Sequence, residues 1–451
     1  MKIKFINHSS IIVEINNTKI LCDPWYKGTA FANGWRLCHD EAIEINELNF
    51  DKIWISHEHP DHFSIPTLKS LKIKKPVYYQ HTKDKKVKNY LESQGHTVFE
   101  LPDNKTHFEK SFKITSIVTE DYDSCILFED EKFKFLNIND SQLDKEAEKI
   151  KIKKHIPIDL ISIQFHYANW AGNFGDEEIP KFKKKQALNR IKEICKLCGT
   201  KNVILFASFI YYSHEENFYW NKPFNDIINT IIELKNDGLN PIIMTPHQEI
   251  TLDSSNNFEK LSNKNHEAIK FWNDKYSKIK IKEYTKSYTL EQIKISYENY
   301  IDKLIIKNNL SKFNEKFLKD FRLNVEIRDL NTIVSLGLYE KVFETKKKLH
   351  ESNYDISLSS EALWILFQND FSLGSITISS RIQFKYENAY KFYFFFLISY
   401  RNNIGVYLKN SITKDLNFEA FRNNGVLKPI FNFNKQAEKN FNTFNNLLKS
   451  I

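Results

Sequence analysis

The sequence has few cysteines, and they are scattered. The five among 451 residues are Cys22, Cys38, Cys125, Cys195 and Cys198. This number and spacing exclude a disulfide framework of the kind that holds small secreted domains together. Cys195 and Cys198 have the spacing of a redox or metal pair, but a second such pair is missing. Two half-buried helix cysteines are therefore the preferred interpretation.

The sequence also lacks an apolar run long enough to cross a membrane. The most apolar stretch, Tyr390 to Tyr400, has about eleven residues, whereas a helix that spans a bilayer needs about twenty. The first residues, Met1 to His8, alternate like a strand and offer no apolar signal-peptide region. These features predict a soluble, cytoplasmic protein without a membrane span.

A concentrated basic stripe is missing as well. The net charge of +8 comes from 65 basic residues that 57 acidic residues partly balance. The densest basic patch, Lys181 to Lys185, is interpreted as the start of a solvated helix, so nucleic-acid binding is not expected. The length and the 41% of hydrophobic residues predict a globular protein of two domains.

Against this background, one short segment concentrates metal-binding side chains. The apolar run Ile53 to Ile55 is typical of a buried strand, and it is followed within a few residues by four polar side chains: His57, His59, Asp61 and His62. Imidazole nitrogens and carboxylate oxygens are the ligands that zinc or iron accepts. Pro66 then indicates that a helix begins just beyond the loop. This strand, loop and helix predict a metal site.

The residues around this segment resemble the metallo-β-lactamase superfamily. The resemblance rests on Asn7-His8-Ser9-Ser10, on a hairpin ending at Asp23-Pro24-Trp25, and on Ser56 to His62. Further matching residues point to the branch of lactonases, phospholipases D and sialic-acid hydroxylases, above all to the hydrolase-like domain of the CMP-N-acetylneuraminate hydroxylases: Gly28, Gly34-Trp35, His39, Asp123-Ser124-Cys125, Ala171 to Gly175, Phe206 to Phe209 and Ser213-His214. The resemblance covers residues 1 to about 250. It implies an α/β fold, the αβ/βα sandwich of this superfamily.

The resemblance also implies further ligands. A bridging aspartate is expected after the strand 133–138, which makes Asp140 the candidate; alternatively only one ion binds tightly and Asp140 supports its ligands. The superfamily histidine about twenty residues earlier is missing, so Asp121 or Asp123 is expected to substitute, which favours iron or manganese over zinc. The last ligand is expected on a later strand edge, where His214 is preferred over His166 and His247.

Other residues are expected to support the site. His8, Asp23 and His39 are predicted to orient the ligands or contact substrate, and Asp23 is suited to accept the second N–H of a metal-bound histidine. The loop 169–175 is glycine-rich and contains Trp170. It is interpreted either as a loop that closes over a sugar or base, or as an ordinary connection with aromatic anchors.

The pattern changes after residue 250. Residues 251–451 are predicted to form a helical or α+β extension, with a resemblance to sterol-carrier modules over residues 350–451. Thr289 is expected to cap a helix, a helix is expected over 361–369, and Ile376, Ile378, Ile382 and Phe384 suggest strands. The roles expected for this part are a lid, a pocket wall or an oligomer contact.

Three functions remain open at this point. The preferred one is a hydrolase in which one or two divalent ions activate water against an ester, lactone or phosphodiester of a sugar or nucleotide-sugar substrate, with Asp61 and His62 as catalytic residues. The second is an iron-dependent hydroxylase of an amino sugar or its nucleotide conjugate. The animal hydroxylases carry an iron–sulfur domain whose cysteine and histidine pairs this sequence lacks, so electrons would come from a separate partner. The third is a binding protein with a degenerate site.

Overall fold

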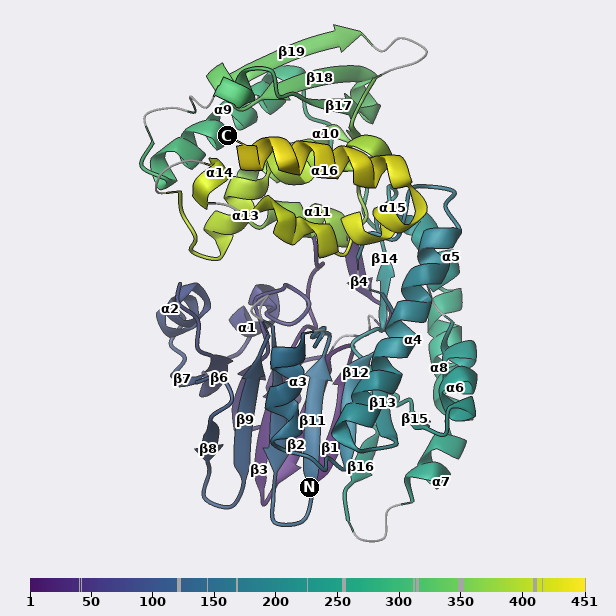
Figure 1. Cartoon of the computed structure of the whole chain (residues 1–451). Helices are drawn as coiled ribbons and strands as arrows, with labels where there is room; N and C mark the ends of the chain where they lie inside the picture. The colour runs from purple at the N-terminus through teal and green to yellow at the C-terminus, as the bar shows by residue number, and fades with distance from the viewer. Residues whose placement is uncertain are drawn as a thin grey trace.

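Two seven-stranded β-sheets pack face to face in the N-terminal part of the computed structural model (Figure 1). The first sheet comprises, in spatial order, β16 (Glu249–Thr251), β1 (Lys2–Asn7), β2 (Ser10–Ile15), β3 (Thr18–Cys22), β5 (Lys52–Ile55), β6 (Val77–Gln80) and β7 (Val98–Leu101). The second comprises β15 (Asn240–Ile242), β13 (Asn202–Phe206), β12 (Leu160–Gln164), β11 (Lys134–Asn139), β10 (Ser124–Glu129), β9 (Lys113–Val118) and β8 (Thr106–Phe108). The structure describes residues 1–39, 41, 43–119, 123–143, 145–167, 169–224, 226–253, 257–310, 313, 316–347, 353–408, 412–415 and 417–450.

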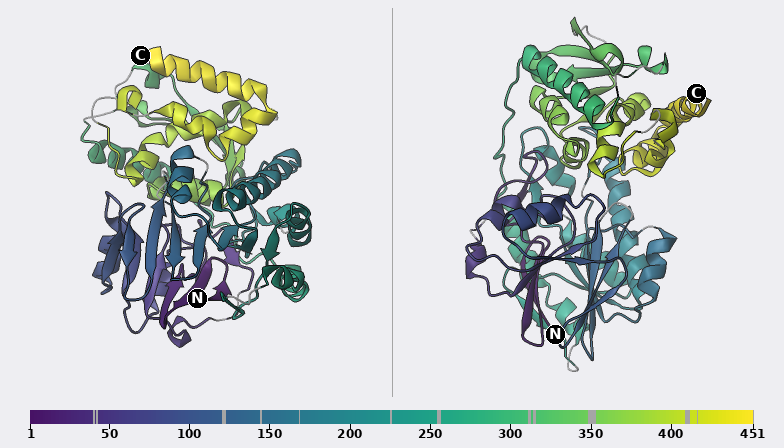
Figure 2. Two further views of the ribbon diagram at one scale, coloured as in Figure 1. Left: turned by 60° about the horizontal axis from the view of Figure 1, so that its bottom comes forward. Right: turned by 90° about the vertical axis from the view of Figure 1, so that its left-hand side faces the viewer.

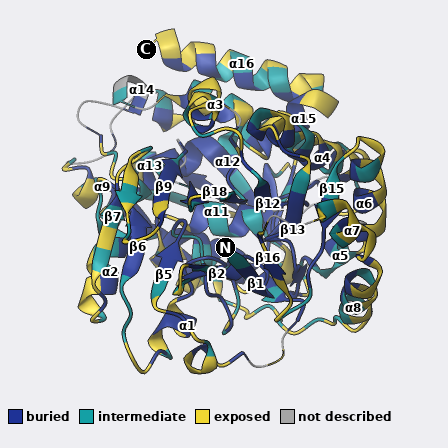
Figure 3. Ribbon diagram, turned by 90° about the horizontal axis from the view of Figure 1, so that it is seen from below, coloured by how far each residue is buried: buried dark blue, intermediate teal, exposed yellow. Residues whose placement is uncertain are grey.

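The apolar residues of the first sheet pack into two hydrophobic clusters, one on each face of the sheet. In β5, Trp54 points into the core between the sheets, whereas Ile53 and Ile55 join a second cluster on the other face. Because successive side chains of a strand point to opposite faces, a strand without polar residues must be covered on both sides. Helices α1 (Ile65–Lys69) and α2 (Lys86–Ser93) contribute to this outer cluster. The inner strands of the sheet are accordingly mostly buried, whereas the edge strands β7 and β16 contain exposed residues (Figure 3).

Helices also cover the outer face of the second sheet. The cluster between the sheets extends to apolar residues of α3 (Glu146–Lys153), α4 (Glu178–Cys198) and α6 (Ile227–Asn236), among them Ile152, Ile191 and Leu234. Helices therefore lie on both sides of the paired sheets (Figure 2). This four-layered arrangement confirms the predicted αβ/βα sandwich. One detail differs: Lys183 of α4, expected on a solvated face, is buried.

Parallel strands bring distant segments to one edge of the sandwich. In the first sheet, β3 and β5 run parallel with Leu21 opposite Ile53, and in the second, β11, β12 and β13 run parallel. The carboxyl ends of parallel strands meet at the same edge. The segments that follow β3, β5 and β11 therefore lie together at the edge that faces the C-terminal part (Figure 1).

The N-terminal unit extends beyond residue 250. Helices α7 (Phe258–Asn263) and α8 (His266–Ser277) follow β16, and Ala268 and Trp272 of α8 belong to the core between the sheets. The indole of Trp272 stacks on Phe209 with ring centroids 3.9 Å apart. We therefore place the start of the extension after Ser277, whereas the sequence suggested residue 251.

The extension has its own sheet and core. Its five strands are, in spatial order, β19 (Val342–Lys347), β18 (Thr332–Gly337), β17 (Leu323–Ile327), β20 (Ile356–Leu358) and β21 (Gln383–Phe384). Its helices are α9 (Leu290–Lys307), α10 (Ser360–Gln368), α11 (Ser372–Ile378), α12 (Ala389–Phe395), α13 (Leu397–Asn403), α14 (Ile412–Asp415), α15 (Leu427–Phe433) and α16 (Lys435–Ser450). A single aromatic-rich cluster joins them. The sterol-carrier resemblance stays a prediction.

Two predictions of local structure in the extension can be compared with its helices. Thr289 caps α9 in a capping box with Gln292, as predicted. The strand predicted at Ile376 and Ile378 is wrong, because both residues lie in α11. Among the described residues, no helix combines the length and the apolar character that crossing a membrane requires.

Candidate metal centre

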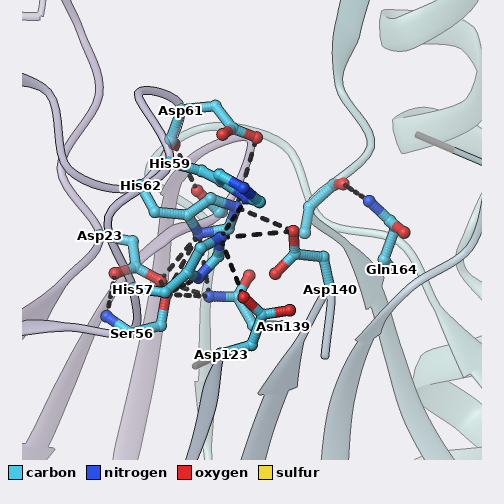
Figure 4. Close-up of polar contacts among 12 residues, drawn as sticks. Asp23, Ser56, His57, His59, Asp61, His62, Asp123, Asn139, Asp140 and Gln164 are labelled. Atoms are coloured by element: carbon cyan, nitrogen blue, oxygen red, sulfur yellow. Dashed lines mark hydrogen bonds and ion pairs between the residues drawn. The ribbon is translucent and has the colours of Figure 1, made fainter. Parts of the chain in front are cut away.

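Seven imidazole and carboxylate side chains converge at the edge where the parallel strands end. Figure 4 labels six of them, all except His8. His57, His59, Asp61 and His62 come from the loop after β5. Asp140 follows β11, Asp123 directly precedes β10, and His8 occupies the turn between β1 and β2. Their ligand atoms form three groups, each within 4.8 Å: His57 with His59 and Asp123, His57 with His62 and Asp140, and His8 with Asp61 and His62.

Asp140 lies between the two halves of the cluster. Its Oδ2 is 3.7 Å from Nε2 of His57 and 3.4 Å from Nε2 of His62. On one side, Asp123 Oδ1 lies 3.8 Å from His57 Nε2, and on the other, Asp61 Oδ2 lies 3.3 Å from His62 Nε2. Asp140 therefore occupies the position from which one carboxylate can serve two ions.

A second layer of hydrogen bonds orients the imidazoles. Asp23, fully buried, accepts the backbone N–H and the hydroxyl of Ser56, each at 2.8 Å, and Nδ1 of His62 at 3.1 Å. Since the Ser56 hydroxyl donates to Asp23, it accepts from Nδ1 of His57 at 2.9 Å. Both rings thereby present Nε2 to the cluster, as in metal sites where a carboxylate fixes the tautomer.

Asn139 completes this layer. Its amide donates to Asp23 and, at 3.0 Å, to the Ser56 hydroxyl. The residue has a φ of 64°, Asp23 has 42° and His8 has 40°. Non-glycine residues seldom adopt these left-handed angles, and they occur most often at functional sites. Sequence reasoning missed Asn139; its place beside Asp140 was the only signal.

The electrostatics of the cluster favour a cation. Burial lowers the pKa of His62, but the carboxylates of Asp140 and Asp61 outweigh burial and raise the pKa well above its usual range. Burial alone would raise the pKa of Asp140, yet the charges of His62 and His57 lower it. Burial holds the pKa of His57 and of His59 below the usual value. The three carboxylates thus face one imidazole whose pKa is raised and two whose pKa values are lowered.

Unsatisfied atoms show that these side chains fit a metal. Asp61 Oδ1 and Asp140 Oδ1 are buried and make no hydrogen bond with any described residue. A buried polar atom without a partner is costly, and most such atoms in native proteins have one. Each of these two oxygens is a standard ligand atom that would gain a partner from a divalent ion.

Most of the predicted residues come together. His57, His59, Asp61, His62 and Asp140 share the cluster. Of the two aspartates proposed in place of the missing histidine, Asp123 is present, and Asp121 lies outside the described residues. His8 was expected in a supporting role, but it belongs to one of the three ligand groups. Its Nε2 lies 3.4 Å from Oδ2 of Asp61.

Three later histidines lie elsewhere. The structure places His214 beside Glu361 and Glu216, at 3.5 and 3.7 Å, and outside all three ligand groups. The prediction that His214 is the last metal ligand is therefore revised. The short strand β14 (Ile210–Tyr212) before it pairs with β4 (Trp35–Leu37) and leads toward the extension. His166 Nε2 lies 2.7 Å from the carbonyl of Ser208, and His247 occupies the turn before β16.

The remaining supporting candidates also lie away from the cluster. The ring of His39 packs on Phe271 with centroids 5.6 Å apart. Trp170 packs edge to face on Phe384 and Tyr386 of the extension, at 5.3 and 6.0 Å. Trp170 thus acts as an aromatic anchor between the two units, which is the second of the two interpretations offered for its loop.

Comparisons with known proteins agree with the geometry. Residues 2–140 match the family model described as a β-lactamase superfamily domain. Over 280 residues the chain is 25% identical to the cytidine monophosphate-N-acetylneuraminic acid hydroxylase of Xenopus laevis, an alignment that covers 56% of this chain and 44% of that protein. The chain spans about half the length of the curated relatives it matches.

Two solved structures illustrate the similarity in fold. CmlA, a diiron β-hydroxylase from Streptomyces venezuelae, aligns with a TM-score of 0.42 at 14% identity, over 56% of this chain and 54% of that one. An isothiocyanate hydrolase from Delia radicum gut bacteria aligns with a TM-score of 0.41 at 14% identity, over 56% of this chain and all of that one (100%). Likenesses this low do not indicate a reaction. The family match assigns residues 2–140 to a β-lactamase superfamily domain, and the four-layered sandwich of the N-terminal part is consistent with that family's fold.

Proposed function

We propose that this chain is an enzyme that holds two metal ions. His57, His59 and Asp123 would bind one ion, Asp61 and His62 with His8 would bind the other, and Asp140 would lie between them. The observation that carries this proposal is the convergence of seven ligand side chains around buried atoms that lack partners. Asp23 and Ser56 would hold the imidazoles in the tautomer that binding requires.

The composition of the ligand groups supports iron. Each of the three groups contains two histidines and one aspartate. Two histidines and one carboxylate are typical of non-haem iron oxygenases. A third carboxylate also neutralises more of the charge of the ions, which makes bound water a weaker acid and stabilises a more oxidised metal. Manganese is compatible with the same ligands, whereas zinc is less favoured.

The function supported best is therefore hydroxylation, with an amino sugar or its nucleotide conjugate as the expected substrate class. The curated relatives are named as hydroxylases of such a compound. Bound iron would supply activation of dioxygen, with one oxygen atom entering a C–H bond and the other leaving as water at the expense of two electrons and two protons. The two electrons would come from a reduced donor. The residues of this chain bind, orient and shield the reacting centre.

A hydrolase is the second candidate, and one observation favours it. Asp61 is 97% buried, and its Oδ1 has no hydrogen-bond partner among the described residues. A carboxylate so placed beside a metal can accept the proton of an attacking water. A divalent ion bound there would lower the pKa of that water from 15.7 toward 7. This chemistry needs no electron donor.

Metal analysis combined with an oxygen assay separates the two candidates. Protein purified without added metal is expected to contain iron, and its reduced form should consume dioxygen in the presence of a CMP-linked amino sugar. Zinc in the purified protein, with ester or phosphodiester hydrolysis under anaerobic conditions, would instead establish the hydrolase. The double variant His57→Ala/His59→Ala should lose metal; unchanged metal content would refute the site.

A further inference from the structure

A tight loop between the metal cluster and the extension connects the two. We call residues 30–35 the Phe31 loop. Ala30 and Trp35 close it through two backbone hydrogen bonds, of 3.0 and 3.1 Å. Phe31, Ala32 and Asn33 have φ values of 49°, 53° and 59°. Three successive non-glycine residues in the left-handed region are strained, so this conformation needs support from its surroundings.

One side of the loop contacts a candidate ligand. The ring of Phe31 packs edge to face on the imidazole of His59, with centroids 5.5 Å apart, and on Trp35 at 4.6 Å. Phe31 is 4% exposed, so its position is fixed by packing. A shift of the loop would move the surface against which His59 rests. The imidazole of His59 is otherwise tied to the cluster through His57, at 2.8 Å between Nδ1 and Nε2.

The other side of the loop is held by the extension. Arg381, fully buried, donates from Nη1 to the carbonyl of Ala32 at 2.6 Å. Gly34 lies so close to the extension that a Cβ at this position would be 2.4 Å from the Cβ of Ser379. The amide of Asn217 donates to the carbonyls of both Gly34 and Ser379, at 3.1 and 2.7 Å. The loop is therefore held at Ala32 and at Gly34.

The guanidinium of Arg381 is itself fixed by two carboxylates. Nε and Nη2 lie 2.8 and 2.7 Å from Glu216 Oε2, and Nη2 donates to Glu361 at 2.6 Å. The planar fork of an arginine satisfies these acceptors and the Ala32 carbonyl at the same time, which a lysine cannot do. The two acids come from different units, Glu216 from the metallo-β-lactamase domain and Glu361 from α10.

From this geometry we propose that Arg381 is a positioning residue for the metal centre: it holds the Phe31 loop in its strained conformation, and Phe31 in turn holds His59. The proposal rests on the proposed metal site. It concerns one half of that site, because Phe31 contacts His59, whereas the ligands Asp61, His62 and His8 are held by Asp23 and the first hairpin. The extension thus contributes to metal binding without supplying a ligand.

A stepwise titration with Co²⁺ tests this. The visible spectrum of Co²⁺ reports its ligands, so the binding of two ions can be followed separately in metal-free full-length protein. In Arg381→Lys, we expect the ion at His57, His59 and Asp123 to bind about tenfold more weakly with an altered spectrum, at the lower end of effects seen for residues that support ligands. The other ion should bind as in the wild type.

Gly34→Ala provides an independent variant, since it leaves the charges intact and displaces the loop from Ser379. It should have the same selective effect, and it decides the question alone if Arg381→Lys fails to fold. Gln383→Ala is the matched control. Gln383 also bridges the two units, donating to the Tyr219 hydroxyl at 2.8 Å and accepting from the Phe174 N–H at 2.7 Å, and both of these partners lie outside the Phe31 loop.

The outcomes separate this inference from the proposed function. Two Co²⁺ ions in the wild type, with one weakened in both loop variants and neither weakened in the control, would support the role of Arg381. Unchanged binding in both loop variants, or equal loss in all three, would overturn it while leaving the metal site intact. No Co²⁺ binding by the wild type would refute the proposed function, and this inference with it.

Discussion

At the scale of single residues, Asp123 is the proposed ligand that most affects the choice of metal. It directly precedes β10, and its carboxylate lies opposite His57 with 3.8 Å between Oδ1 and Nε2. A histidine at this place would make three imidazoles on one ion, a set common in zinc enzymes. An aspartate adds negative charge and a hard oxygen ligand, which favours iron.

Asp123→His is therefore expected to change metal selection. The variant should acquire zinc in preference to iron, because a third imidazole replaces a carboxylate. Metal content after expression in medium with equal iron and zinc measures this, and Asp123→Asn, which removes the charge without adding an imidazole, is the control. Iron content unchanged in the histidine variant would show that Asp123 is not a ligand.

Asp23 is not a proposed ligand, but it orients the ligands through hydrogen bonds. Its carboxylate accepts from Ser56, His62 and Asn139, so Asp23→Ala should free two imidazoles from their orientation. We expect metal affinity to fall by about 10- to 100-fold, measured by competition with a chelator. Asp51→Ala is a control, since the exposed Asp51 accepts from the Lys19 N–H at 2.8 Å, at the start of the neighbouring strands and outside the metal cluster. Equal affinity in both variants would contradict this role.

The ligands differ in how far the sequence could predict them. His57, His59, Asp61 and His62 belong to one loop, so their spacing alone predicts a site. His8 and Asp123 join the cluster only because β1, β5, β10 and β11 come together in two sheets. Neither spacing nor composition contains that information. His214 followed a buried strand as a ligand would, but its neighbour Glu361 comes from more than a hundred residues away.

At the scale of elements, α4 carries a buried charge where the sequence predicted a solvated face. Lys183 donates to the carbonyl of Trp170, and burial lowers the pKa of its ammonium to about 7. Four of the five residues from Lys181 to Lys185 are lysines, yet the helical period turns Lys183 toward the protein and Lys181 and Lys185 toward solvent. Composition alone could not distinguish these positions.

This lysine makes stability depend on pH. Below pH 7 both the folded and the unfolded states hold its proton, and burial of the charge destabilises the fold. Between about pH 7 and the unfolded pKa of 10.5, the folded state releases the proton first, so stability rises by at most ~1.4 kcal/mol per unit. Lys183→Met should lack this rise. Urea unfolding at pH 7 and pH 9.5 measures it, and equal pH dependence in both proteins would contradict the assignment.

The C-terminal elements show why alternation can mislead. Ile376 and Ile378 alternate with polar residues like a strand, but they lie in α11, where Ile376 faces the core of the extension. The segment is too short for alternation and helical period to be told apart. The capping box of α9 was predictable, because Thr289 and Gln292 interact locally.

At the scale of the whole molecule, the extension contacts the N-terminal domain at two places, one on each side of the loop that carries His57, His59, Asp61 and His62. On one side Asn403 of α13 donates to Glu58, the residue between His57 and His59, at 3.0 Å, and Glu58 pairs with Lys86 at 2.5 Å. On the other side Arg381 holds the Phe31 loop. The centre thus depends on residues from both halves of the chain.

These two contacts should differ in how much they contribute to the free energy of unfolding. Lys86 and Glu58 are 38% and 31% exposed, and Lys86→Met should cost no more than about 1 kcal/mol because water screens the pair. Glu216 is 7% exposed and pairs with Arg381 and Arg328; Glu216→Gln should cost about 3 kcal/mol, since it leaves a buried cation partly unpaired. Chemical unfolding measures both. Similar losses would contradict the difference in burial.

Anomalous X-ray scattering from crystals of the iron-loaded protein, recorded at the iron absorption edge, tests the metal centre most directly. Two peaks are expected, one among His57, His59 and Asp123 and one among His8, Asp61 and His62, with Asp140 between them. No peak within reach of these side chains, or a peak bound by residues outside this set, would contradict the account.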